Sequence, residues 1–224
     1  MAVAAPAMAQ GIDAMKAVLL DLDGTLSDSR PGIEGCMRLA MADLGHPLDP
    51  DADLGWAIGP PTEDVFARMV APFGGSVAKA VALYRKHYAA GGWSDNTPYP
   101  GIAAALAALA GRYLATSKRV DFARMILEHF GFARHFTAIH GAEMDGTRAH
   151  KPEMIAHILT THGLDPAACV MIGDRSFDIH GAHANNVRAL GVLWGYGTRA
   201  EFDHAGADGV IAAPEDMPDA IGRL

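Results

Sequence analysis

A short apolar run that ends in two aspartates sets the class of fold that this chain can adopt. The run spans residues 16–20, Lys-Ala-Val-Leu-Leu, and Asp21-Leu22-Asp23-Gly24-Thr25 follows at once. An uninterrupted apolar run of this length is typical of a strand inside a parallel sheet, because helices cover both of its faces. We therefore predict a buried strand over residues 16–20 whose carboxyl end presents Asp21 and Asp23.

Strand-like and helical segments alternate through the second half of the chain. Strand patterns at 113–115, 136–140, 169–172, 189–194 and 209–212 are separated by helical patterns at 102–110, 121–130, 153–162 and 177–184. Such alternation predicts a parallel sheet with right-handed crossover connections and helices on both faces. The expected fold class is α/β, with a three-layer, Rossmann-like core.

Residues 29–96 do not follow this alternation. Helical patterns at 31–46, 63–70 and 77–89 succeed one another there without a strand pattern between them. We predict a small helical cap domain, residues 29–96, inserted after the first strand of an α/β core domain, residues 15–28 and 97–224. The turn-rich segments 27–31 and 95–101 would serve as hinges.

The charge balance limits the partners of the chain. Its 224 residues include 26 acidic and 18 basic side chains, a formal net charge of -8. Chains this acidic are poor general binders of nucleic acids and of anionic membranes, so we expect neither partner. No apolar run is long enough to span a bilayer. We expect a monomer or homodimer that acts on a small molecule.

The cysteines and the first residues indicate the compartment. Cys36 and Cys169 are far apart in the sequence and cannot form a disulfide framework. Free thiols fit a reducing cytoplasm, which is the expected location. The first eleven residues, MAVAAPAMAQG, lack the basic start and long apolar centre of a signal peptide, so we expect a flexible extension there.

Polar side chains gather where the predicted strands end. Ligands of open parallel sheets bind outside the carboxyl ends of the strands, so these side chains are expected to share one crevice. They are Asp21, Asp23, Gly24, Thr25, Thr116, Ser117, Lys118, Lys151, Asp174 and Asp178. Carboxylates gathered in one place repel one another unless a cation neutralises them, and oxygen ligands favour Mg2+ over zinc. The pattern predicts a magnesium site.

The spacing of the first two aspartates suits a reaction at phosphorus. Residues i and i+2 of a strand face the same way, so Asp21 and Asp23 can address one site as nucleophile and as acid/base. A carboxylate that attacks phosphorus forms an acyl phosphate, which divides a hard hydrolysis into two easier steps. A lysine, a hydroxyl and magnesium are suitable partners for the charge of the transferred group. Gly24 allows the sharp turn that follows.

Four segments, in the right order, resemble the motifs of the haloacid dehalogenase-like phosphohydrolases. They are Asp21–Leu26, Leu114–Lys118, Lys151-Pro152 and Gly173–Asp178. The helical insert falls where that family places its cap, and the match covers residues 16–213. The later half looks most like the phosphoglycolate-phosphatase and 5'-nucleotidase-like branch. The resemblance implies a magnesium-dependent phosphoric monoester hydrolase with a phospho-aspartyl intermediate.

The resemblance also implies a role for each motif residue. Asp21 would be the nucleophile and a metal ligand, and Asp23 would be the acid/base and bind the metal through its backbone carbonyl. Thr116 would bind the phosphoryl oxygens, Lys151 would neutralise the nucleophile and the phosphate, and Asp174 would complete the magnesium site. Asp178 would support it or orient Lys151, while Gly24, Thr25, Ser117 and Lys118 would contact the substrate.

Other polar residues have two interpretations each. His180 and His183 share a helix face, and a solvated face is favoured over a metal site. Arg175 would bind a distal charge of the substrate or, slightly favoured, pair with a surface acid. Trp56 would read the leaving group or belong to the core of the cap.

The substrate is not fixed by these residues. A small phosphomonoester of the 2-phosphoglycolate type ranks first on resemblance, and the alternatives are a nucleoside monophosphate or a phosphomutase of the beta-phosphoglucomutase type. Asp23 argues against a dehalogenase, whose leaving group needs no proton. Phosphonate hydrolysis would need a cap lysine, and Lys79 and Lys86 both fit an exposed face. A catalytically silent binding or regulatory module is the remaining alternative.

Overall fold

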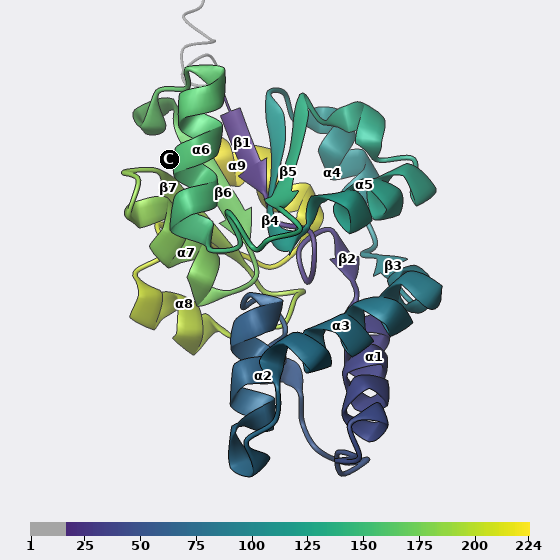
Figure 1. Cartoon of the computed structure of the whole chain (residues 1–224). Coiled ribbons are helices and arrows are strands. Elements are labelled where there is room, and N and C mark those ends of the chain that lie inside the picture. The colour runs from purple at the N-terminus through teal and green to yellow at the C-terminus, as the bar shows by residue number, and fades with distance from the viewer. Residues whose placement is uncertain (1–16) are drawn as a thin grey trace, which may run out of the picture.

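The computed structural model describes residues 17–224 and contains one parallel sheet with helices on both sides, next to a separate group of helices (Figure 1). The predicted extension over the first eleven residues, and Lys16 of the first predicted strand, lie outside the described residues. The sheet has the order β5-β4-β1-β6-β7-β8, and every neighbouring pair is parallel. Its strands are β1 (Ala17–Leu20), β4 (Arg112–Arg119), β5 (Ala138–Ala142), β6 (Cys169–Gly173), β7 (Arg188–Val192) and β8 (Gly209–Ile211).

Strand β1 lies inside the sheet and explains the layers. Its four residues are all buried, with Val18 and Leu20 in one hydrophobic cluster and Ala17 and Leu19 in another. The first cluster includes residues of α4 (Ile102–Ala108), α5 (Val120–His129) and α9 (Met217–Gly222). The second includes residues of α6 (Lys151–His162), α7 (Ser176–His183) and α8 (Arg199–Ala205). Successive side chains of a strand point to opposite faces, so the continuous apolar run feeds both interfaces.

The predicted three-layer α/β fold is confirmed, and the differences are local. Helices α8 and α9, which have seven and six residues, were not predicted. Strand β4 reaches Arg119, with a register shift against β5 between Ala115 and Arg119. Within residues 17–224, no helix is long and apolar enough to cross a membrane.

A group of three helices lies beyond the carboxyl ends of β1 and β4 (Figure 1). These helices are α1 (Arg30–Asp43), α2 (Thr62–Val70) and α3 (Val77–Ala90). They bury a hydrophobic cluster of their own, in which Met37, Phe66 and Tyr88 are nearly inaccessible to solvent. Phe122 of α5 also belongs to this cluster and so joins it to the sheet domain. Short 3-10 helices lie at Gly55–Ala57, Ala71–Phe73, Gly92–Ser94, Ala133–His135, Pro166–Ala168 and Pro214–Asp216.

The chain passes between the two parts through a small antiparallel ribbon. Strand β2 (Ser27–Asp28) pairs with β3 (Thr97–Pro98), so the outgoing and returning segments lie side by side. A two-residue ribbon gives no sequence pattern, and it was not predicted. We propose the division into a core of 15–28 and 97–224 and a cap of 29–96, supported by the separate hydrophobic cluster of α1–α3.

Candidate active site

The sheet brings the first and fourth motifs together. The backbone N–H of Asp21 donates to the carbonyl of Ile172 in β6, 3.1 Å away, so the ends of β1 and β6 are adjacent. Gly24 has a φ of +80°, and a Cβ at this position would lie 2.1–2.8 Å from the carboxylate atoms of Asp174. A glycine is therefore required where the first motif turns over Asp174.

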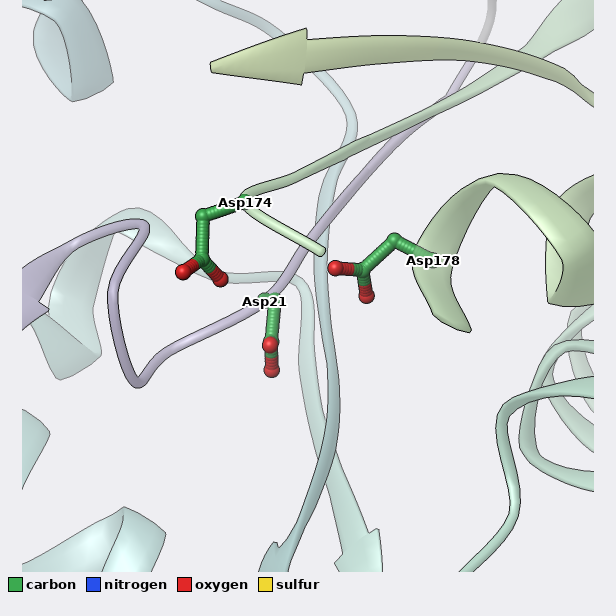
Figure 2. Close-up of side chains that lie close together, drawn as sticks. All are labelled: Asp21, Asp174 and Asp178. Carbon is green, nitrogen blue, oxygen red and sulfur yellow. The ribbon is translucent and has the colours of Figure 1, made fainter. Parts of the chain in front are cut away.

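Three buried aspartates form the centre of the site (Figure 2). Carboxylate oxygens of Asp21, Asp174 and Asp178, from the end of β1, the end of β6 and the first turn of α7, all lie within 4.8 Å of one another. The exposed fractions of these residues are 4%, 0% and 1%. Among residues 17–224, this is the one group of three or more His, Cys, Asp or Glu with such geometry.

Lys151, at the start of α6, bridges two of these carboxylates. Its Nζ lies 3.0 Å from Asp21 Oδ1 and 2.6 Å from Asp178 Oδ1, and it donates to the carbonyl of Ala115 at 2.8 Å. A single ammonium therefore pairs with two of the three clustered carboxylates. This excess of hard, anionic oxygen donors fits a divalent cation such as Mg2+.

The electrostatics of the cluster favour an additional positive charge. Burial raises the pKa of Asp21 to about 6, against the effect of Lys151, and Asp178 and Asp23 raise it further. Burial, followed by the charges of Asp178 and Asp21, raises the pKa of Asp174 well above its ordinary value. Burial tends to lower the pKa of Lys151, but the two bridged carboxylates raise it overall. A bound divalent cation would keep these acids ionised.

Asp23 points to a different partner from Asp21. Its carboxylate forms an ion pair with Lys118, at 2.9 Å between Oδ2 and Nζ, and the ammonium also lies 4.7 Å from the centre of the Tyr88 ring. The other oxygen, Asp23 Oδ1, is buried and has no hydrogen-bond partner within the described part of the chain. One oxygen of the expected acid/base is thus available to a ligand.

A cavity of about 60 Å³ lies between the strand ends and the helical group. The sheet domain contributes the predicted residues Asp21, Asp23, Thr116, Ser117 and Lys118, together with Arg119 and Phe122. The helical group contributes Ile33, Met37, Ala57, Ile58, Gly59, Pro60, Thr62, Tyr84, Arg85 and Tyr88. Tyr88 is 2% exposed, and its hydroxyl has no hydrogen-bond partner among residues 17–224. The cavity thus has charged side chains on the side of the sheet domain and largely apolar and aromatic side chains on the side of the helical group.

Two predicted substrate contacts lie beside the acidic cluster and do not line the cavity. The hydroxyl of Thr25 donates to Asp174 Oδ1 at 3.4 Å, and Gly24 packs on the same carboxylate. This geometry lets both residues hold Asp174 in place. Their role as substrate contacts, like the metal contact through the carbonyl of Asp23, stays a prediction.

The loop 194–197 was missed by the sequence analysis. The N–H of Tyr196 donates to Asp174 Oδ2 at 2.9 Å, and its hydroxyl donates to Asp28 Oδ1 at 2.9 Å. That hydroxyl also accepts from the N–H groups of Ser29 and Arg30. One residue therefore touches both the acidic cluster and the ribbon that leads to α1. No sequence signal distinguishes this loop from an ordinary turn after a strand.

The ambiguous side chains have other partners. His183 lies 3.0 Å from Asp208, which favours the interpretation as a surface face. Trp56 lies under the guanidinium of Arg68 and does not line the cavity. Arg175 pairs with Glu201, the favoured interpretation, and also reaches the helical group.

Comparison with known proteins agrees with this geometry. Residues 15–186 match the family model described as haloacid dehalogenase-like hydrolase. A 5'-nucleotidase from Pseudomonas aeruginosa is 44% identical over 83% of this chain and 86% of its own length. The tyrosine-protein kinase PtkA from Mycobacterium tuberculosis is 41% identical over 92% of this chain and 72% of its own length.

Two more distant proteins are similar over nearly the whole chain. A plasmid-encoded phosphoglycolate phosphatase from Cupriavidus necator is 30% identical over 90% of this chain and 91% of its own. The crystal structure of a predicted phosphatase from Clostridium acetobutylicum superposes with a TM-score of 0.87 at 31% identity, covering 94% of this chain and 99% of that one. Motifs, fold and comparisons agree, and the chain belongs to the haloacid dehalogenase-like hydrolases.

Proposed function

We propose that this hydrolase is a Mg2+-dependent phosphatase of small phosphomonoesters that works through a phospho-aspartyl intermediate on Asp21. The observation that supports it best is the arrangement of one buried lysine between two of three buried aspartates. The cluster is poor in positive charge, so it suits a cation together with a phosphoryl group. Asp21, Asp174 and the carbonyl of Asp23 would hold Mg2+, with Asp178 close by.

The proposed reaction assigns one task to each side chain. Asp21 attacks phosphorus and displaces the alcohol, and Asp23 gives its proton to the leaving oxygen. Asp23 then removes a proton from the water that hydrolyses the acyl phosphate. Thr116 and Lys151 bind the phosphoryl oxygens as charge builds up on them. Bound Mg2+ would supply further positive charge for the phosphoryl group.

The charges of the residues that line the cavity favour one kind of leaving group over another. Each lining cation already has an acidic partner: Lys118 has Asp23, Arg85 has Glu63 and Arg119 has Asp121. The carboxylate of a glycolate leaving group would have to displace one of these partners. An uncharged alcohol would instead meet the apolar side chains of Ile33, Met37 and Phe122 and the free hydroxyl of Tyr88.

A nucleoside monophosphate is therefore the second candidate substrate beside 2-phosphoglycolate. Its leaving group is uncharged, and the 44% identical relative is named a 5'-nucleotidase. The cavity of about 60 Å³ is far smaller than the roughly 300–1,000 Å³ of sites that enclose drug-sized ligands. A nucleoside would need the cap to stand further from the core.

We propose a cytoplasmic monomer or homodimer whose partner is a small phosphorylated metabolite, without nucleic-acid or membrane partners. The net charge of -8 supports the last point.

The test is phosphate release from a panel of phosphomonoesters, with Mg2+ and with excess chelator. The panel contains 2-phosphoglycolate, nucleoside monophosphates, sugar phosphates and an aryl phosphate. We expect turnover with Mg2+, loss of turnover with chelator, and loss in Asp21→Asn but not in the exposed control Asp203→Asn. A single preferred ester would identify the substrate. No release from any ester would refute the phosphatase and favour the mutase or the silent module.

A further inference from the structure

Arg175 connects the acidic site to the helical group. It stands between Asp174 and the first turn of α7, and its Nη1 donates to the carbonyls of Ile58 at 2.6 Å and Gly55 at 3.3 Å. Its side chain is 15% exposed. Hydrogen bonds from a guanidinium to carbonyl oxygens are charge-assisted and stronger than neutral ones.

The segment that Arg175 holds is part of the cavity. Ile58, Gly59 and Pro60 line it from the side of the helical group. Gly59 has a φ of +110°, and a Cβ there would lie 3.2 Å from Cγ of Arg175. The backbone at Gly59 therefore rests directly on the arginine side chain, in a conformation that favours glycine.

Arg175 is itself fixed from the sheet domain. Its Nε donates to Glu201 Oε1 at 3.1 Å, and the same oxygen accepts the N–H of Ser176 at 2.7 Å. The N–H of Arg175 donates to Asp178 Oδ2 at 3.1 Å. The guanidinium is thus held in one orientation by Glu201 of α8 while its far end reaches across to the helical group.

We propose that Arg175 is a positioning residue that holds the segment 55–60 closed over the active site. It acts on the substrate through this segment, which forms one wall of the leaving-group side of the cavity. Opening that wall requires the bonds to Ile58 and Gly55 to break, while the bond to Glu201 persists. The kinetic part of this inference rests on the proposed phosphatase function, but the structural part does not.

The experiment compares hydrogen exchange and kinetics in Arg175→Ala, Arg175→Lys and a matched control. Arg38 is the control, because it donates to the carbonyls of Asp49 and Ala52 entirely within the helical group. Exchange of the backbone amides of residues 55–59 is measured without substrate, since Pro60 and Pro61 have no amide hydrogen. Arg175→Ala should raise exchange there about tenfold or more, as expected for the loss of a charge-assisted bond. Arg175→Lys keeps the positive charge but lacks the planar guanidinium, so it should raise amide exchange less. Arg38→Ala should leave amide exchange in this segment unchanged.

The kinetic readout separates positioning from simple destabilisation. With the best ester of the panel, KM of Arg175→Ala should rise about tenfold while kcat changes less than about twofold. If Arg175→Ala does not fold, Arg175→Lys and Glu201→Gln carry the same comparison. Unchanged exchange in residues 55–59 would overturn the inference, and so would faster exchange confined to the start of α7. An inactive wild-type enzyme would refute the phosphatase and leave the exchange result decisive for Arg175.

Discussion

Replacing Lys151 by methionine removes the only ammonium within hydrogen-bonding distance of Asp21 and Asp178 among residues 17–224. Lys151, Asp21 and Asp178 are each at least 96% buried, so solvent cannot replace the lost partner. Removal of one member of a buried ion pair costs about 3–5 kcal/mol. For a chain of this size, each kcal/mol lowers Tm by about 2–4 °C. We expect Lys151→Met to lower Tm by roughly 6–20 °C without Mg2+.

The assay is thermal unfolding of the wild type and four variants, with and without Mg2+. Lys86→Met is the control, because Lys86 is exposed on α3 and has no ion-pair partner within the described residues. Asp178→Asn and the double variant Lys151→Met/Asp178→Asn complete a double-mutant cycle. Losses should be strongly non-additive, since each partner is costly to leave alone. A Tm of Lys151→Met within about 2 °C of the wild type would refute the reasoning.

Three further predictions concern other parts of the molecule. Gly24→Ala should destabilise the protein by more than Gly45→Ala in thermal unfolding, because both have positive φ but only Gly24 meets a neighbour, the carboxylate of Asp174; equal losses would contradict this. Mg2+ should raise Tm of the wild type and not of Asp174→Asn, because an ion that binds only the folded state stabilises it; an equal rise in both would place the ion elsewhere. Burial, with His162 and His157 next, lowers the pKa of His140 to about 4 from an ordinary value of 6.5. The unfolded state then binds the proton first, so the contribution of His140 to stability should be full above about pH 6.5 and be lost as the pH falls toward 4. Denaturant unfolding should show a smaller fall in His140→Gln, and equal falls would contradict the assignment.

Much of the fold was predictable because apolar runs in a parallel sheet carry a strong pattern. The run before Asp21 is buried on both faces, and this fixed the strand, the sheet and the edge at which the motif residues meet. The short elements were not predictable. A two-residue strand at Ser27–Asp28 and a six-residue helix at Met217–Gly222 offer too few residues for periodicity to show.

The candidate site also contains residues that the sequence predicts and residues that it does not. Asp21, Asp174, Asp178 and Lys151 stand at strand and helix ends, where the topology alone brings them together. The residues that the helical group contributes to the cavity were not predicted. A side chain such as Tyr88 occupies a helix face that is equally consistent with core packing. The arrangement of Asp23 with Lys118 depends on the path of β4 after its register shift, and no sequence pattern reports that path.

The central claim is that Asp21 attacks phosphorus, and trapping the intermediate tests it most directly. The enzyme is mixed with Mg2+ and its best ester, quenched in acid within the first turnover, and reduced with borohydride, which converts an aspartyl phosphate to homoserine. Peptide mass spectrometry then locates the modified residue. The account predicts homoserine at position 21 and none in Asp21→Asn. Modification at Asp23 or elsewhere, or none despite turnover, would contradict it.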